Sequence, residues 1–284
     1  MATAVANTPT YIEKKIPSPE GIAADQTATW KLPIGPQYME LQLAFSGVTL
    51  AQMTEIRILA NGRPFQTFSA ADRNTMNMFD GMADAATDGV LILPFTRRGL
   101  KTGVGEWETG VTTGVADQAG RRIDSLNVEI DIAAGASAPS IEMTASITSP
   151  RPSGPGTLLH IARYRRNLSG VGQFDISDLP KGTPTTIALN RTWFKEEGGE
   201  TVERLEVERD GRSLWRRNAN LNARIQADHV RVPQAGWFVL DKTERGYGGD
   251  PITLQGYNDF RFMVDTSGAQ SLTIYQETMG VLGQ

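Results

Sequence analysis

The two halves of the chain carry the same landmarks in the same order, and this repeat limits the fold more than any other feature. Residues 89–99 read GVLILPFTRRG, and residues 236–246, lying 147 positions further on, read GWFVLDKTERG. The turn LPIG at 32–35 returns as LPKG at 179–182 with the same spacing. Shared order together with shared spacing indicates two tandem copies of one domain.

Two more landmarks support the duplication and locate an insertion. The turn Asn61–Arg63 returns as Asp210–Arg212, 149 residues later. Near the end of each copy, Asp131 and Asp265 follow an apolar alternation and precede a glycine, but their spacing has shrunk to 134 residues. The first copy therefore holds extra residues between Gly99 and Asp131.

Both copies have the pattern of short strands joined by turns. Met39, Leu41 and Leu43 alternate with polar residues, which puts one face of a strand on a core and the other toward water. Asn-Gly at 61–62, between two such runs, is a strong hairpin signal. Short helices are expected in the loops, with Thr49 and Ser69 as N-caps, and residues 218–225 correspond to the second of them.

The number of strands indicates the fold class. With 29 glycines and 15 prolines, the 284 residues suit many turns and two domains of ordinary size. Eight strands per copy is the number of a jelly roll. The sequence therefore predicts an all-β fold of two tandem eight-stranded jelly rolls, a double jelly roll, with short helices in loops. The strands predicted for the second copy are Phe174–Leu179, Thr185–Asn190, Val202–Glu208, Arg212–Trp215, Trp237–Leu240, Ile252–Leu254, Phe260–Val264 and Ser271–Glu277.

Composition along the chain suggests where the domains begin and end. Residues 1–25 hold scattered prolines without apolar periodicity, and we expect an N-terminal arm there. Residues 149–160 open with SPRPSGPG, which cannot continue a sheet, and we expect a linker. The first jelly roll is then predicted at 26–148 and the second at 161–284. The N-terminal residues lack the pattern of a secretory signal, and no apolar stretch has the length of a membrane span.

The inventory of reactive residues argues against an enzyme. The chain has no cysteine, and its two histidines, His160 and His229, fall in different elements. A histidine-rich metal site or a Ser-His-Asp triad therefore lacks its parts. The net charge of −4 gives no signature for nucleic acid. We predict no catalytic, cofactor-binding or metal-binding residue, and no required cofactor.

Three features leave alternatives open. The duplicated Asp131 and Asp265 are expected to cap turn amides, while a glycosidase pair or calcium ligation remains open. The basic run Arg163–Arg166 suits lipid headgroups, an acidic neighbouring subunit, nucleic acid or a solvated connection. The Gly- and Thr-rich stretch Gly99–Asp124, without a counterpart in the second copy, is expected at the periphery as an exterior or intersubunit loop.

At this point the residues resemble a family. Lys31–Phe65, with its LPIG turn, SGVTLAQ turn and NGR hairpin, is similar to the first jelly roll of the major capsid proteins of corticovirus-type phages. RYRRN and DISDLP, within Arg163–Pro180, resemble the opening of that family's second jelly roll. None of these motifs is catalytic, so the resemblance concerns ancestry and architecture.

The resemblance implies a structural major capsid protein of a tailless, membrane-containing icosahedral bacteriophage. Three copies would form a pseudo-hexagonal capsomer that tiles a virion shell over an internal membrane. The implied partners are further copies, neighbouring trimers, other capsid or membrane proteins and the internal lipid, and the implied location is the virion, assembled in the host cytoplasm. The family also suggests calcium at subunit contacts, for which no residue here matches a motif. The alternative is a tandem β-sandwich that binds carbohydrate, which requires a row of exposed aromatic side chains.

Overall fold

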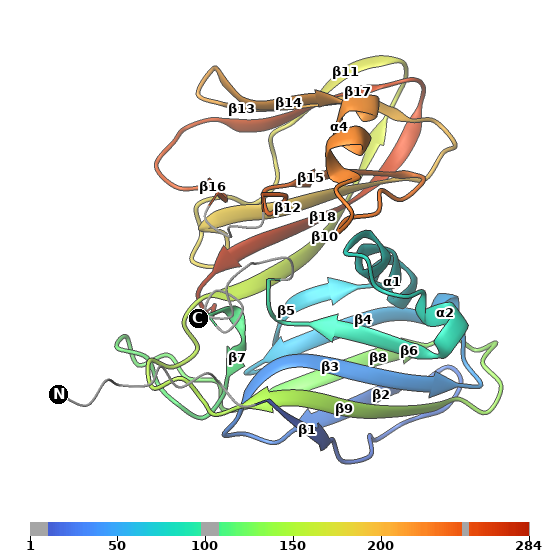
Figure 1. Ribbon diagram of the computed structural model, residues 1–284, viewed down its shortest axis with the longest axis vertical. Coiled ribbons are helices and arrows are strands. Elements are labelled where there is room, and N and C mark those ends of the chain that lie inside the picture. The colour runs from blue at the N-terminus through green and yellow to red at the C-terminus, as the bar shows by residue number, and fades with distance from the viewer. Residues whose placement is uncertain (1–10, 98–107, 246–249, 284) are drawn as a thin grey trace.

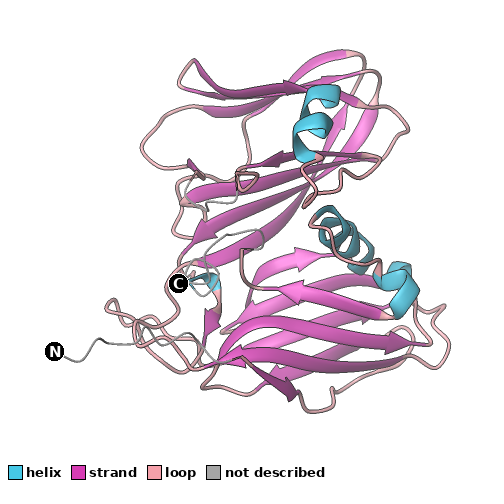
Figure 2. Ribbon diagram, in the orientation of Figure 1, coloured by secondary structure: helices cyan, strands magenta, loops and turns pink. Residues whose placement is uncertain are grey.

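The computed structural model describes residues 11–97, 108–245 and 250–283. Figure 1 shows two β-sandwiches, one from each half of the chain, stacked along the long axis. Strands dominate and the helices lie in connections, as Figure 2 shows. The tandem arrangement and the jelly-roll character of the prediction are confirmed.

The first jelly roll has one sheet of its own. This five-stranded sheet has the order β1–β9–β3–β6, with β7 paired to β3. Its strands are β1 (Ile12–Lys15), β9 (Ser140–Thr148), β3 (Gln37–Ser46), β6 (Val90–Pro94) and β7 (Val111–Thr112).

The second jelly roll also has a sheet of its own. It is four-stranded, with the order β11–β17–β13–β14. Its strands are β11 (Gly172–Ile176), β17 (Phe260–Thr266), β13 (Val202–Arg209) and β14 (Arg212–Asn218).

A nine-stranded sheet runs through both halves. Its order is β15–β12–β18–β10–β5–β4–β8–β2, with β16 beside β12. The halves join where β10 and β5 run parallel, at Ile161 and Gln66. The strands are β15 (Trp237–Asp241), β12 (Ala188–Glu196), β18 (Gln270–Gly280), β10 (Leu158–Leu168), β5 (Arg63–Phe68), β4 (Met53–Ala60), β8 (Leu126–Ile132), β2 (Thr27–Leu32) and β16 (Ile252–Thr253).

The helices begin where the sequence placed their caps. The side chain of Thr49 caps the 3-10 turn η1 (Leu50–Gln52), and Ser69 caps α1 (Ala70–Phe79) by accepting from the Asp72 amide. Asn218 caps the corresponding helix α4 (Ala219–Gln226) in the second half, and α2 (Ala85–Asp88) follows α1. None of the helices in the described part of the chain reaches the length and apolarity of a membrane span.

The duplication extends to individual hydrogen bonds. Asn61 and Asp210 both adopt positive φ, 52° and 46°, ahead of a glycine at 77°, which is the backbone of a tight hairpin. The side-chain oxygen of Asn61 accepts from two consecutive amides, at 2.8 and 3.2 Å, and Asp210 does the same at 3.1 and 2.9 Å. Each hairpin is therefore hydrogen-bonded to the residues just before a neighbouring strand of its sheet, β8 in the first half and β17 in the second.

The helix after each hairpin is also anchored in the same way. The amide of Asn77 in α1 donates to Ile92 O of β6 at 2.8 Å. In the second half, the amide of Gln226 in α4 donates to Val239 O of β15 at 2.8 Å. Because buried carbonyls need a donor, these amides fix each helix over its strand.

Three parts of the structure differ from the expected boundaries. Strand β1 lies within residues 1–25 and pairs with β9 over Ile12–Lys15. Strand β10 begins at Leu158, within the predicted linker, and its pairing with β18 spans eleven residues. Strand β12 begins at Ala188 and continues to Glu196, beyond the predicted Thr185–Asn190.

The extra stretch Gly99–Asp124 is only partly peripheral. Its residues up to 107 lie outside the described residues. Residues 109–113 are buried, against the expectation, because β7 pairs with β3 and the Arg151 guanidinium binds the chain around it. Arg151 donates to Gly110 O at 2.9 Å and to Thr112 Oγ1 at 3.2 Å. Residues 114–122, in contrast, lie at the surface.

Candidate functional site

The feature that sets this molecule apart from two independent sandwiches is the seam between them, which we define by α1, β10, β12, β15 and β18. Figure 1 shows α1 of the first jelly roll lying against the long strands of the second. Asp72 of α1 is 6% exposed and accepts from Lys195 Nζ of β12 at 2.8 Å. It also accepts the hydroxyl hydrogen of Tyr275 in β18. Burial, followed by the nearby carboxylate, raises the pKa of Tyr275.

Aromatic side chains fill the seam beside this contact. Phe79, the last residue of α1, meets Trp193 of β12 edge to face, with ring centroids 5.0 Å apart. Trp237 lies 6.4 Å from Trp193 and stacks on Tyr275 at 6.2 Å. Trp193 and Tyr275 belong to the hydrophobic core of the first jelly roll although the second half supplies them. The hydrophobic core of the first jelly roll therefore extends across the seam into the second half.

A buried ion network lies at the far end of α1. Arg191 of β12 contacts Asp80, the C-cap of α1, at 2.9 Å and Asp241 of β15 at 3.1 Å. Arg231 binds the other oxygen of Asp241, and Thr243 donates to that carboxylate at 2.7 Å. Burial pushes the pKa of Asp241 upward, but the two guanidinium groups outweigh it and the pKa lies below its ordinary value. The network joins the jelly rolls through charged side chains that are almost fully buried.

Glu277 of β18 completes the polar part of the seam. It is 6% exposed and accepts a hydrogen bond from the Asn190 amide. Burial raises its pKa, while the charge of Arg191 opposes that shift. Arg73 of α1 and Arg97 line the same small cavity, so cations from the first jelly roll face an acid of the second.

The two histidines lie in different elements and differ in burial. His160 is buried in β10, and its Nε2 lies 3.1 Å from Val281 O. Since a carbonyl only accepts, Nε2 carries the hydrogen, and burial lowers the pKa of His160 to about 4. His229 sits exposed in a turn with a φ of 68°. Within the described ranges, no group of three or more potential metal ligands gathers.

The duplicated aspartates bind arginines, so the expected capping of turn amides is wrong. Asp131 accepts from Arg57 of β4 at 2.7 and 2.9 Å and from Thr27 at 2.6 Å. Asp265 pairs with Arg204 of β13, which is the position 147 residues after Arg57. A cross-strand ion pair is therefore another duplicated feature. The two aspartates lie in different sheets, and a glycosidase pair loses its support.

The basic run is part of strand β10, and acidic side chains compensate it. Arg163 pairs with Glu55 of β4 and Arg165 with Glu197, just after β12. Arg166 binds Asp178 at 2.7 Å. These pairs explain how three arginines fit within a sheet, and they argue against an uncompensated patch for nucleic acid.

The four tryptophans in the described part of the chain do not form the exposed row that carbohydrate binding requires. Trp30, Trp193 and Trp215 are buried, and Trp237 packs into the seam. Trp107 lies outside the described residues. The carbohydrate-binding alternative therefore loses its motivating feature.

Sequence reasoning missed the seam residues Asp72, Arg191 and Asp241. The available signal was a charged residue within an otherwise apolar strand: Arg191 in ALNRTWF and Asp241 in WFVLD. Such a charge has to find a partner when the strand is buried. The partner itself could not be read from the sequence.

Comparison with known proteins settles the family. Residues 13–148 match the viral coat protein P2 N-terminal domain, and residues 158–282 match the viral coat protein P2 C-terminal domain. The chain belongs to the viral coat protein P2 family. Within it, the chain is 26% identical over 279 residues to the major capsid protein P2 of Pseudoalteromonas phage PM2, which covers 92% of this chain and 93% of that protein. The resemblance seen in the sequence is thereby confirmed.

Solved structures show the same fold. The crystal structure of P2 from bacteriophage PM2 superposes with a TM-score of 0.85 at 22% identity, covering 97% of this chain and 99% of that one. The atomic structure of Sulfolobus turreted icosahedral virus gives 0.65 at 9% identity, with 95% and 90% covered. The PBCV-1 virus capsid gives 0.64 at 7%, with 95% and 93% covered. The P2-family chain thus has the double jelly roll of viral capsid proteins. The family models and the major capsid relative show that its role is structural.

Proposed function

We propose that this chain is the major capsid protein of a tailless icosahedral bacteriophage, and that three copies form its capsomer. The observation that carries the proposal is the fixed pairing of two alike jelly rolls in one chain. Three such chains around a three-fold axis present six similar sides, which suits a hexagonal lattice. The 26% identity to the PM2 major capsid protein, along nearly the whole chain, supports the same role.

The buried seam supports this function physically. A capsomer subunit has to keep its two jelly rolls in one fixed orientation, because each of them contacts a different neighbouring subunit. The ion network around Arg191 and the aromatic contact of Phe79 with Trp193 hold α1 against the second jelly roll. Interdomain contacts of this kind are stiffer than the polar interfaces that permit domain motion.

The proposal includes partners that follow from the role. These are neighbouring trimers, other capsid or membrane proteins, an internal membrane, and calcium at subunit contacts, with assembly in the host cytoplasm. We propose no enzymatic activity. The seam residues that are charged are engaged with one another, as in a structural contact.

Sedimentation of the purified chain, with and without calcium, tests the capsomer. Three chains of 30.9 kDa give 3 × 30.9, or about 93 kDa. We expect that mass or larger shells. A monomer that calcium leaves unchanged would contradict the trimer. A trimer that dissociates into monomers when calcium is chelated would assign the cation to the subunit contact.

A further inference from the structure

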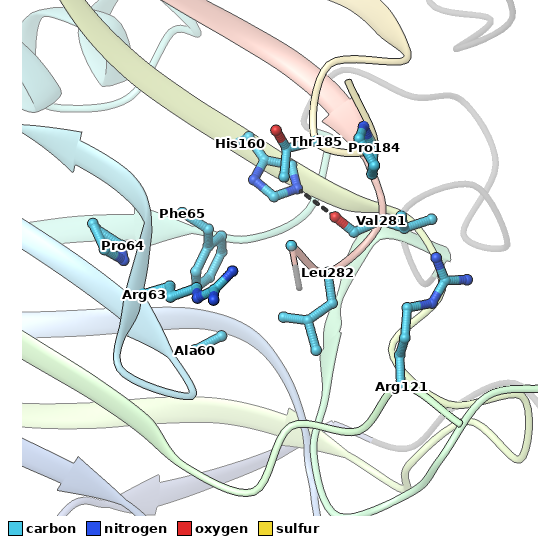
Figure 3. A pocket seen from close by; sticks show the side chains of 11 residues that line it. Ala60, Arg63, Pro64, Phe65, Arg121, His160, Pro184, Thr185, Val281 and Leu282 are labelled. Atoms are coloured by element: carbon cyan, nitrogen blue, oxygen red, sulfur yellow. Dashed lines mark hydrogen bonds between the residues drawn. The ribbon is translucent and has the colours of Figure 1, made fainter. Parts of the chain in front are cut away.

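A pocket of about 500 Å³ opens where the two jelly rolls meet, and nothing in the proposed function uses it. Figure 3 shows its walls. The first jelly roll contributes the hairpin end of β5 and Arg121, and the second contributes His160, the loop at Pro184 and the segment 281–283. Its volume lies within the range of small-molecule sites.

The lining is mostly apolar and firmly held. Phe65 is 7% exposed, stacks on Phe95 at 6.2 Å and meets the His160 ring edge to face at 6.1 Å. Leu282 is 8% exposed and points into the space opposite Phe65 in Figure 3. The hydrogen bond from His160 to Val281 O fixes the segment that carries Leu282. The pocket therefore exists before any ligand enters.

The charged groups on the pocket are arginines. Arg63 is exposed at the hairpin, and within the described residues its guanidinium has no ion pair. Arg121 binds Asp117 through Nε at 2.7 Å, and its terminal nitrogens have no further partner in the described part of the chain. Asp117 offsets part of that charge, but no acidic residue lines the pocket itself among the residues described. Neutral His160 adds none at pH 7.

We propose that this pocket binds an amphiphilic anion. The apolar body of the ligand lies against Phe65 and Leu282, and the guanidinium groups of Arg63 and Arg121, one on each side of the pocket in Figure 3, attract its negative head. Burial of hydrocarbon against an apolar wall is favourable, and a guanidinium without an ion-pair partner can form charge-assisted hydrogen bonds with a carboxylate or a phosphate. A fatty acid and a lipid phosphate share this chemistry.

Calorimetric titration of the intact, assembled protein with decanoate, decyl phosphate, decanol and inorganic phosphate tests the site. We expect the two amphiphilic anions to bind, and decanol and inorganic phosphate to bind at least about tenfold more weakly, because each lacks one half of the recognition. Tighter binding of decyl phosphate would assign the head to a lipid phosphate, and tighter binding of decanoate would assign it to a fatty acid. Equal binding of decanol and decanoate would overturn the proposal.

The duplication supplies a matched control for the arginine. Arg63 follows the Asn61-Gly62 turn, and Arg212 follows the corresponding turn in the second half, where it is also exposed but does not line the pocket. We expect Arg63→Gln and Arg121→Gln each to weaken decanoate binding about tenfold and Arg212→Gln to leave it unchanged. If all three bind alike, decanoate lies elsewhere and the pocket is not its site. Unchanged sedimentation of the Arg63 and Arg212 variants would show that both still assemble. A loss of decanoate binding could then be distinguished from a loss of trimer assembly.

Discussion

At the residue scale, His160 is a buried imidazole whose environment favours its neutral form. Burial lowers its pKa from 6.5 to about 4, while the hydrogen bond to Val281 O opposes this shift. The unfolded chain therefore binds more protons than the folded chain between these two values. The free energy of unfolding falls as the pH drops from 6.5 toward 4, by about 3 kcal/mol in total.

His160→Gln is expected to remove this pH dependence, because its amide donates to the same carbonyl without titrating. Urea midpoints at pH 5 and pH 7.5 measure it: the native chain should lose more stability at pH 5 than the variant. His229→Asn is the control, since that exposed turn residue has the left-handed backbone that asparagine tolerates. An equal loss of stability between pH 7.5 and pH 5 in all three chains would show that His160 does not cause the destabilisation in acid.

Arg191 is the residue on which the buried network depends most. Its removal leaves the carboxylates of Asp80 and Asp241 buried without their shared partner. We expect Arg191→Met to lower the free energy of unfolding by about 4 kcal/mol. Arg57→Met is the matched control: Arg57 also contacts several carboxylates, but its side chain is 25% exposed, so its loss should cost about 1 kcal/mol. Urea denaturation of the two variants compares them, and similar losses would contradict the role of burial.

At the element scale, β10 is a strand whose charged residues make it hard to recognise from the sequence. Arg163, Arg165 and Arg166 resemble a basic surface run in the sequence, yet each has an acidic partner from a neighbouring element. Those partners are Glu55, Glu197 and Asp178. The strand is stable because its pairing with β18 runs through all eleven residues. A run of arginines in the sequence is therefore compatible with a paired strand when other elements supply the acidic partners.

Strand β1 is the edge of the five-stranded sheet, and it covers the backbone of β9. We expect a chain that starts at Ile16 to associate in a concentration-dependent way, because β9 then presents unpaired amides and carbonyls. A chain that starts at Tyr11 keeps β1 and is the control. Light scattering across a concentration series measures the difference. Identical scattering of the two chains would show that β1 does not protect the edge.

At the scale of the whole molecule, the nine-stranded sheet and the shared core should make the two jelly rolls unfold together. Trp193 and Phe194 are neighbours in β12 that point to opposite sides: Trp193 lies in the first core, and Phe194 meets Phe262 in the second. We expect one calorimetric transition for the native chain and two for Trp193→Ala, which removes the contact with Phe79.

Phe194→Ala is the matched control for that experiment. It removes a similar aromatic volume from the same strand, at a cost of about 3–5 kcal/mol, but leaves the seam intact. It should therefore lower the stability without splitting the transition. Two transitions in both variants would place the coupling between the jelly rolls outside Trp193.

The sequence by itself determined the duplication, the hairpins at 61–62 and 210–211, the helix caps and most strands of the second copy. These features are local: alternation, a positive φ and an N-cap each depend on a few neighbouring residues. Only the tertiary structure decided that Arg191 meets Asp80, 111 residues away, that Asp131 binds Arg57, and that a pocket opens at the seam. Such partners depend on which strands lie side by side, because a buried charge or an apolar wall is completed by whatever distant chain the packing brings to it.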